Sequence, residues 1–473
     1  MLKTYNKTIG IEVHVELKTD NKIFSPSLNH YGNMANTSVN VIDLGYPGTL
    51  PIFNIDVLKT SIKACHVLNL DITKEMHFDR KNYFYPDNPK NFQITQFNTP
   101  IGRNGYVEIT KKNGEKKKIF IEEAHMEEDT CKSVHGDKTS LLDFNRAGVP
   151  LLEIVTKPCI NDSEEAVLYL EQLRELLLYS DVSDCKIEEG SMRCDANISI
   201  SDSDILGTKV EVKNIGSITN VGLAIDYEAK RQQEVIENGE KVIEETRRYD
   251  DKNNITISMR VKETGNDYRY FPEPDIPVIE LNDDFINNCL SDLKTMPSER
   301  REKYLKAGIN EINVNKIIQN KEISDYLENF DNINLVIASN LLLGDISSYL
   351  NKNNTSIYDT KMTYSKFLEL VEKLEKEEIS NKIFKDILND LMETDKSASD
   401  IINEKGISLV SDEASIRLLI ENVLCNNQKL VDDYKGGNER ASKALMGQVM
   451  KESHGSVAPN LANKLLMEIL NEK

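Results

Sequence analysis

Several features that would place a protein in a familiar class are missing from this chain of 473 residues. It has no tryptophan, and it has no apolar run of the roughly 18 residues that a transmembrane helix requires. The amino-terminal segment MLKTYNKTIG lacks the apolar core of a secretory signal. We therefore expect no membrane span and a cytoplasmic location, or an organelle stroma or matrix if a transit peptide has been removed.

Cysteine pairs and the common cofactor motifs are absent as well. The seven cysteines are odd in number and include no CxxC pair, which favours a reducing compartment over a disulfide framework. No Walker A sequence, no GxGxxG after a predicted strand and no HExxH is present. A metal-dependent hydrolase is disfavoured because no nucleophile or metal-hydrolase motif is recognisable.

Positive charge is scarce. Lysine and arginine number 58 against 78 acidic residues, so the formal net charge is −20. This balance argues against general nucleic-acid binding, which depends on positive potential. Residues 406–473, however, contain 9 acids and 8 bases and are nearly neutral. A polyanion would have to bind a local basic face.

The pattern of apolar and polar residues along the chain predicts three regions. A chain of this length usually forms two or three domains. Residues 1–295 alternate like strands, with helical segments between them, and predict an α+β domain with a mainly antiparallel sheet. A two-residue hairpin turn is expected at Asn113-Gly114. Residues 296–405 predict an all-α helical domain, and residues 406–473 a tail domain with two amphipathic helices.

The segment GIEVHVELKT, residues 10–19, raises the central question. At the period of a strand, the residues Glu12, His14 and Glu16 share the face opposite the apolar one. Other predicted strands also carry a charged face: His125, Glu127 and Asp129; Arg193, Asp195 and Asn197; Lys209, Glu211 and Lys213; Arg260 and Lys262. If these strands share a sheet, one of its faces is a floor of carboxylates, imidazole and cations.

Such a floor predicts a metal–nucleotide site. Mg²⁺ and Mn²⁺ prefer oxygen ligands with an occasional imidazole, and cationic side chains suit phosphates. Glu153 lies in the apolar run VPLLEIVTKP, where an ionised carboxylate needs a cation or donors. Residues i and i+4 of a strand lie about 13 Å apart, so one ion cannot bind both Glu12 and Glu16. The alternative is an ordinary solvated sheet face with a structural histidine.

Two aromatic segments carry a second signal. FDRKNYFYPDNPKNFQITQF and DYRYFPEPDIP combine aromatic rings, prolines and cationic residues. Such segments could clamp a nucleotide or an RNA end by stacking and charge, or they could be packed surface loops.

Several long motifs follow one another in a familiar order: IGIEVHVELKT, FDRKNYFYPDNPK, HMEED, NRAGVPLLEIV, EEGSMRCDANIS, RVKETGNDYRYFPEPD and KALMGQVMKES. From about residue 8 to the carboxyl terminus, the chain resembles the B subunit of the aspartyl/glutamyl-tRNA(Asn/Gln) amidotransferases, the tRNA-dependent transamidases. The resemblance implies a cradle domain similar to the antiparallel-sheet catalytic folds of glutamine synthetase and guanidino kinases, followed by helical and tail domains.

The resemblance also implies a reaction. The family uses ATP and Mg²⁺ (or Mn²⁺) to phosphorylate the side-chain carboxylate of Glu or Asp misacylated on tRNA(Gln) or tRNA(Asn). Ammonia from a separate amidase (glutaminase), the A subunit, then displaces the phosphate, and a small C subunit completes a heterotrimer. We therefore expect a carbon–nitrogen ligase of protein biosynthesis that does not itself hydrolyse glutamine. Whether tRNA(Gln), tRNA(Asn) or both are substrates is left open.

The family's functional positions can be carried over residue by residue. The implied catalytic set is Glu12, His14, Glu127 and Glu153; the implied metal ligands are His14, Glu127 and Glu153, with Glu12 and Asp195 for a second ion. We assign phosphate contacts to Arg193, Lys213 and Arg260, and substrate or ammonia passage to Arg80, Lys81 and Tyr83.

Two further expectations concern zinc and tRNA. Some relatives carry a zinc knuckle whose cysteines correspond here to Ser25, Ser27, Asn40 and Asp43, so no structural zinc is expected. The family's tail binds tRNA, and the candidate contacts are Lys435, Arg440, Lys443 and Lys451. The competing hypothesis, from a different class, is a non-catalytic tRNA-binding scaffold protein within the same complex. A scaffold has no need of a metal-binding floor.

Overall fold

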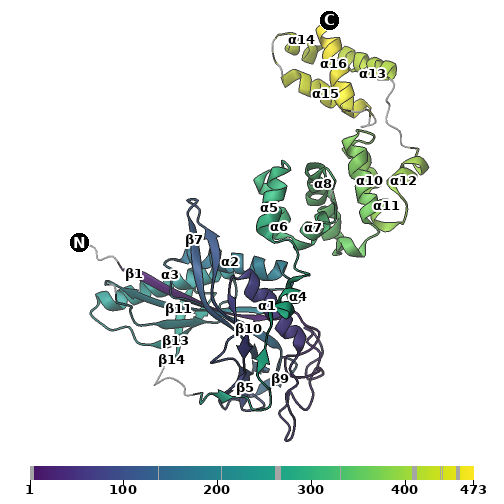
Figure 1. Cartoon of the computed structure of the whole chain (residues 1–473). Helices are drawn as coiled ribbons and strands as arrows, with labels where there is room; N and C mark the ends of the chain where they lie inside the picture. The colour runs from purple at the N-terminus through teal and green to yellow at the C-terminus, as the bar shows by residue number, and fades with distance from the viewer. Residues whose placement is uncertain are drawn as a thin grey trace. The chain divides into compact units, whose positions relative to one another are not determined.

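The computed structural model describes residues 5–136, 138–203, 205–261, 268–330, 332–406, 413–436, 438, 440–453, 457 and 459–472. The chain forms two compact units, residues 1–297 and residues 298–473 (Figure 1). The first unit is mixed α/β, with a large sheet, and the second is helical. The expected α+β region and the helical carboxyl-terminal region are thus confirmed. The division of the second unit into separate helical and tail domains stays a prediction.

The strands predicted to carry charged faces share one sheet. Its strand order is β14-β13-β12-β11-β1-β10-β7-β6-β2, and every neighbouring pair is antiparallel except β12 and β13. The bounds are β1 (Asn6–Glu16), β2 (Asp71–Ile72), β6 (Gly102–Thr110), β7 (Lys116–Glu128), β10 (Pro150–Thr156), β11 (Met192–Ser201), β12 (Val210–Lys213), β13 (Glu245–Asp250) and β14 (Ile255–Val261).

Helices and short strands complete the first unit. The helices are α1 (Ile55–Val67), α2 (Ser163–Tyr179), α3 (Ile218–Glu237) and α4 (Asp283–Leu290). The short strands form three small sheets: β15 (Phe271–Pro272), β4 (Asp79–Asn82) and β5 (Phe92–Thr95); β16 (Ile279–Glu280) and β3 (Glu75–Met76); β8 (Lys132–His135) and β9 (Ser140–Asp143). Helix α2 packs against β6, and α3 packs against β11. These helices therefore cover one face of the large sheet.

Alternation along β1 shows why the two sheet faces differ. Ile11, Val13 and Val15 are at most 1% exposed and belong to the core. Burial of each such side chain contributes about 1.5–3 kcal/mol. Glu12 and His14, between them, lie on the opposite face and are only partly buried. The register is strongly specified, because a slip of one residue would exchange the two sets.

The hairpin predicted between β6 and β7 forms, but its turn differs from the prediction. Lys111 N donates to Glu115 O at 2.8 Å, which leaves residues 112–114 as a three-residue loop. Gly114 has a φ of +85°, whereas Asn113 is not among the residues with positive φ. A two-residue type I′ turn needs positive φ at both central residues, so the prediction of a two-residue turn was wrong.

The second unit consists of helices with short connections. They are α5 (Pro297–Lys306), α6 (Glu311–Gln319), α7 (Lys321–Leu327), α8 (Leu335–Leu341), a π-helix (Leu342–Ile346), α9 (Ser347–Asn353), a 3₁₀ helix (Ile357–Asp359), α10 (Tyr364–Glu375), α11 (Asn381–Glu393), α12 (Ala398–Glu404), α13 (Glu413–Asn426), α14 (Gln428–Lys435), α15 (Arg440–Glu452) and α16 (Pro459–Glu472). Helices α13 to α16 share an apolar core. Among the described residues of the whole chain, no helix is both long and apolar enough to cross a membrane.

Gly105 of β6 packs tightly against the residues that follow α1. A Cβ at this position would lie 2.6 Å from the carbonyl oxygen of Leu68 and 2.7 Å from Leu70 Cγ. We expect Gly105→Ala to lower the free energy of unfolding of the first unit by about 1–3 kcal/mol through overpacking. Urea unfolding measures this loss. Gly10→Ala in β1 is the control, because its nearest neighbours lie 3.9 Å away. Equal stability of the two variants would contradict the prediction.

Candidate active site

Four polar residues face one another across neighbouring strands. His14 of β1 lies opposite Arg193 of β11 and Glu153 of β10, and Glu153 lies opposite His125 of β7. Directly opposed residues on one face of an antiparallel pair have Cβ atoms about 4.5–5.5 Å apart. Strand pairing alone therefore assembles an arginine, two imidazoles and a carboxylate in a row across the sheet.

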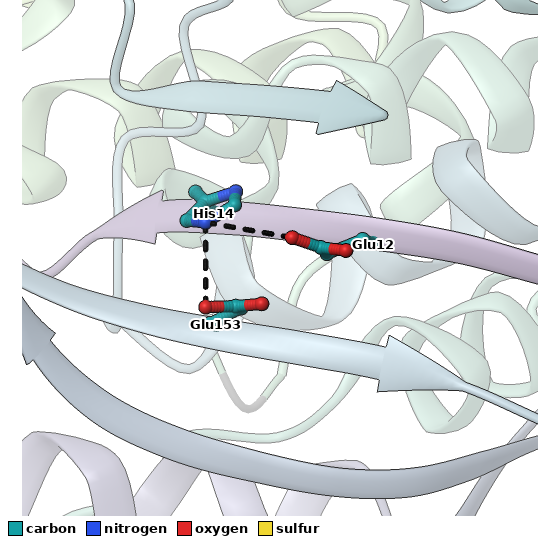
Figure 2. Close-up of side chains that lie close together, drawn as sticks. All are labelled: Glu12, His14 and Glu153. Carbon is teal, nitrogen blue, oxygen red and sulfur yellow. Dashed lines mark ion pairs between the residues drawn. The ribbon is translucent and has the colours of Figure 1, made fainter. Parts of the chain in front are cut away.

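Carboxylates surround the two imidazoles. His14 Nε2 lies 3.4 Å from Glu153 Oε2 and 3.9 Å from Glu12 Oε1 (Figure 2). His125 Nε2 lies 2.9 Å from the same Glu153 oxygen and 3.8 Å from Glu127 Oε2. Two sets of ligand atoms, one from Glu12, His14 and Glu153 and the other from His125, Glu127 and Glu153, each lie within 4.8 Å of one another. Glu153 belongs to both sets.

The ionisation of this cluster follows from burial and mutual charge. Burial opposes ionisation of Glu153, but His125 and His14 outweigh it and hold the pKa of this carboxyl well below its usual range. Burial and the neighbouring Glu153 raise the pKa of Glu12 to about 7. Burial alone would lower the pKa of His14, yet Glu153 and Glu12 raise it to about 9. Protons thus balance the carboxylates, as a divalent cation could.

The donor set fits a hard divalent cation. Mg²⁺ and Mn²⁺ take carboxylate oxygens readily and accept an imidazole nitrogen. Glu12, Glu127 and Glu153 supply oxygens, and His14 supplies a nitrogen that faces the adjacent cavity. Cys194 lines the same cavity, but it is not part of either ligand set. These donor types are compatible with a hard divalent cation.

An open cavity of about 510 Å³ adjoins the cluster. This volume is in the range of small-molecule sites. Its lining includes His14, Lys81, Tyr83, Glu127, Asp129, Arg193, Asp195 and Lys213. Most of the predicted catalytic, phosphate and passage residues thus meet in one place, as the shared polar face predicted.

The cations of the cavity are paired with carboxylates. Arg193 Nη2 donates to Asp129 Oδ2 at 2.6 Å, while its buried Nε has no hydrogen-bond partner among the described residues. Lys213 Nζ lies 2.6 Å from Asp195 and 2.9 Å from Glu211. The unpartnered Nε is a donor that an anion in the cavity could satisfy.

Lys81 and Tyr83 reach the cavity, but Arg80 does not. Lys81 Nζ lies 3.2 Å from Glu127 Oε1. Arg80 instead donates from Nε and Nη2 to Glu273 at 2.6 and 2.9 Å, and its guanidinium stacks 4.2 Å from the Phe92 ring. Successive residues of a strand point to opposite faces, so β4 can present only one of Arg80 and Lys81 to the cavity. The assignment of Arg80 to substrate or ammonia passage stays a prediction that this cavity does not support.

Arg260 and Asp195 stay predictions for different reasons. Arg260 pairs in register with Thr246 near the end of β14, at the edge of the sheet, and its side chain lies outside the described residues. Asp195 lies opposite Glu12 in the register of β1 and β11. Its carboxylate is engaged with Lys213 and is in neither ligand set.

His125 is the residue that the sequence analysis missed. The alternation of HMEED placed it on one face with Glu127 and Asp129, but it received no role. Its contact with Glu153 depends on the pairing of β7 with β10, which the sequence pattern does not specify. Burial lowers the pKa of His125, but Glu153 more than offsets this and the pKa is raised overall.

The four zinc-knuckle positions come together around one carboxylate. Asp43 accepts hydrogen bonds from the hydroxyls of Ser25 and Ser27, both at 2.6 Å, and from the backbone N–H of Asn40 at 3.0 Å. Lys22 Nζ, whose side chain is fully buried, lies 3.4 Å from Asp43. Structural zinc sites use thiolates and imidazoles, which this cluster lacks. The absence of zinc stays a prediction.

The four candidate tRNA contacts are exposed. Lys435 ends α14, and Arg440, Lys443 and Lys451 lie on α15. Offsets of 3 and 11 residues from Arg440 place these three on one side of the helix. Binding of a polyanion to this acidic chain would require a local positive face, and the basic side of α15 is the candidate. Its contact with tRNA stays a prediction.

The fold and the cluster together define a class: a protein with a mainly antiparallel sheet whose polar face gathers carboxylates and imidazoles beside cationic side chains. Comparison with known families makes this specific. Residues 7–287 match the family described as GatB/GatE catalytic domain, and residues 322–470 match the GatB domain. The chain belongs to the family of the B subunit of the aspartyl/glutamyl-tRNA(Asn/Gln) amidotransferases.

Relatives that carry this name align along nearly the whole chain. The protein of Staphylococcus saprophyticus subsp. saprophyticus is 44% identical over 474 residues, which cover 99% of this chain and 100% of the relative. The Geobacillus thermodenitrificans protein is 44% identical over 475 residues, with the same coverage. The Streptococcus mutans serotype c protein is 45% identical over 472 residues, which cover 98% of each chain. The family expected from the motifs is confirmed.

The Lys22–Asp43 pair provides a stability test. Removing one partner of a buried ion pair leaves an uncompensated charge and typically costs about 3–5 kcal/mol. We expect Asp43→Asn to lower the free energy of unfolding of the first unit by this amount, measured by urea unfolding. Lys22→Met in the Asp43→Asn background should recover part of the loss, because the unpaired ammonium is gone. Additive losses in the double variant would contradict the pairing.

Proposed function

We propose that this chain is the component that activates and amidates misacylated tRNA in the transamidase. It would use ATP to phosphorylate the side-chain carboxylate of Glu-tRNA(Gln) or Asp-tRNA(Asn), and ammonia would then displace phosphate to give Gln-tRNA(Gln) or Asn-tRNA(Asn). The observation that carries this proposal is that two possible ligand sets share Glu153, and that one member of each, His14 and Glu127, lines the same cavity. Membership of the family supports the same reaction.

The metal would be Mg²⁺ or Mn²⁺. We assign His14, Glu127 and Glu153 as its ligands, with Glu12 and Asp195 for a second ion. When bound, a divalent cation supplies charge neutralisation for the phosphates of ATP. The observed donors fit this role because the two ligand sets offer carboxylates and imidazoles, of which Glu127 and His14 line the cavity.

The remaining cavity residues have complementary roles. Arg193 and Lys213 would contact phosphate oxygens, since both line the cavity and Arg193 has an unpartnered Nε in the described part of the chain. Arg260 stays a candidate for the same role. Lys81 and Tyr83 would guide the substrate or the incoming ammonia, because they line the cavity on the side of β4. Most of catalysis would then come from positioning and electrostatics.

The floor of carboxylates favours a catalytic role over a scaffold. Concentrating Glu12, Glu127 and Glu153 around one site costs energy in the absence of a cation, and a scaffold gains nothing from it. The same polar sheet face underlies our proposal that the cradle is related in architecture to glutamine synthetase and guanidino kinases.

The reaction requires partners. We propose a heterotrimer with an amidase, the A subunit, which hydrolyses glutamine, and a small C subunit; the complex would act on tRNA in the cytoplasm. The names of the relatives, which mark them as one subunit of an enzyme, support a multi-subunit complex. Reconstitution with both partners, assayed separately on Glu-tRNA(Gln) and Asp-tRNA(Asn), tests the activity and its substrate range. Product on neither tRNA would contradict the proposed function.

The metal floor can be tested inside the reconstituted complex. We expect His14→Ala and Glu153→Ala each to lower transamidation by at least about a hundredfold, since each removes a proposed metal ligand. Glutamine hydrolysis by the amidase should largely remain, because that reaction belongs to another protein of the complex. Glu122→Ala is the matched control, being an exposed carboxylate on β7, the strand that also carries Glu127. Undiminished transamidation by both site variants would refute the assignment.

The basic side of α15 makes a separate prediction. Truncation at Gly406 should weaken tRNA binding and raise the apparent KM for charged tRNA, while turnover at saturating tRNA largely survives. Triple substitution of Arg440, Lys443 and Lys451 by Glu should have the same effect with the tail retained. The loss should shrink as salt rises, because ionic contacts to phosphate are removed.

The matched control for the tail is Lys464→Glu, a charge reversal at an exposed position of α16. Filter binding or fluorescence anisotropy at low and high salt measures the affinity. If the truncated chain binds tRNA as tightly as the intact chain at low salt, the tail is only a helical cap.

A further inference from the structure

We infer that His125 is a positioning residue that donates a hydrogen bond from Nε2 to Glu153, and is not itself a metal ligand. The inference deepens the proposed function and rests on it, because it assumes that Glu153 binds a cation. It assigns different roles to the two imidazoles that flank one carboxylate.

The contact between His125 and Glu153 is an ion pair at a distance that suits a hydrogen bond. His125 Nε2 lies 2.9 Å from Glu153 Oε2, whereas it is 3.8 Å from the nearest Glu127 oxygen. His14 Nε2 lies 3.4 Å from the same Glu153 oxygen. N–H···O bonds centre on about 2.9–3.0 Å, so His125 makes the better hydrogen bond of the two.

The other nitrogen of His125 decides between donor and ligand. His125 Nδ1 is buried and has no hydrogen-bond partner in the part of the chain that the structure describes. If Nε2 bound a metal, the ring hydrogen would sit on Nδ1, and a buried N–H without an acceptor costs about 1–3 kcal/mol. Metal-bound histidines almost always donate this hydrogen to a partner. Once a cation neutralises the charge of Glu153, His125 can be neutral with its hydrogen on Nε2, and only a lone pair is then left unpaired at Nδ1.

The positions of the two histidines in the site also favour His14 as the ligand and His125 as the positioning residue. His14 lines the cavity, whereas His125 is not among the cavity-lining residues. The His125 side chain is also less exposed, at 13% against 22% for His14. A cation entering from the cavity would meet His14 first, with His125 on the far side of Glu153 in the cross-strand row.

The hydrogen bond restricts rotation of the Glu153 carboxylate. Ligating carboxylates are themselves commonly held by hydrogen bonds from a surrounding shell, and loss of such a partner typically weakens metal binding about 10–100-fold. His125 provides this restraint from β7, a strand to which β10 is already paired.

The test is a titration of the full chain with Mn²⁺, in which electron paramagnetic resonance measures how much of the ion is bound. His125→Gln keeps an amide N–H near the position of Nε2 and should bind Mn²⁺ within about threefold of wild type. His125→Leu lacks a donor, and His125→Asn has one that is too short to reach Glu153. Both should bind about 10–100-fold more weakly. The asparagine variant keeps a polar side chain at this position. Its Mn²⁺ affinity therefore tests the inference if the leucine variant fails to fold.

A second readout separates positioning from ligation. Pulsed paramagnetic resonance detects the nitrogen of a coordinated imidazole. When saturated with Mn²⁺, His125→Leu and His125→Asn should keep the nitrogen coupling of wild type, and His14→Gln should lose it. Thermal unfolding of each metal-free variant shows whether lost affinity reflects lost folding.

Four results would overturn the inference. Reduced nitrogen coupling in a saturated His125 variant would make His125 a ligand. The donor role would be refuted if His125→Asn bound Mn²⁺ with wild-type affinity. It would also be refuted if His125→Gln and His125→Asn bound Mn²⁺ equally weakly. Absence of Mn²⁺ binding by the wild-type chain would overturn the proposed metal site and this inference together, whereas the other results leave the proposed function intact.

Discussion

The pairing register of four central strands, β11, β1, β10 and β7, is the constraint on which the site depends. Their apolar residues are buried on one face, so the free energy of the core determines which residues face the cavity. The row of Arg193, His14, Glu153 and His125 is a by-product of that register. No loop has to be ordered to assemble these four groups, so their spacing is as rigid as the sheet itself.

That rigidity has an electrostatic consequence. The sheet brings Glu12 and Glu153 together whether or not a cation is present, and in its absence protons must compensate. The raised pKa values of Glu12, to about 7, and of His14, to about 9, describe this compensation. A bound divalent cation would replace the protons without moving the strands. The strand register alone thus sets part of the charge arrangement that the proposed chemistry needs.

The sequence predicted the polar face well because period-two alternation is a local signal. It placed Glu12, His14 and Glu127 on polar strand faces without knowledge of the strand order, whereas Glu153 was noticed as a carboxylate in an apolar run. It missed His125, since a cross-strand contact depends on which strands are neighbours. It did not predict that Arg80 pairs with Glu273 and does not line the cavity, because β4 belongs to a small separate sheet and the face of an isolated four-residue strand is hard to predict. The predicted length of the hairpin turn was wrong for a related reason, because Asn-Gly is compatible with several loop lengths.

Every described cationic side chain of the cavity is paired with a carboxylate. This pairing bears on how an acidic chain could bind a phosphate-rich substrate. Lys81 is engaged with Glu127, Lys213 with Asp195, and Arg193 with Asp129. In this state, the carboxylates largely cancel the positive charge that phosphates would need. A cation held by Glu127 would compete with Lys81 for the same carboxylate and leave the lysine more available to an anion. Binding of metal and of phosphate would therefore favour each other, because each relieves the charge that the other leaves uncompensated.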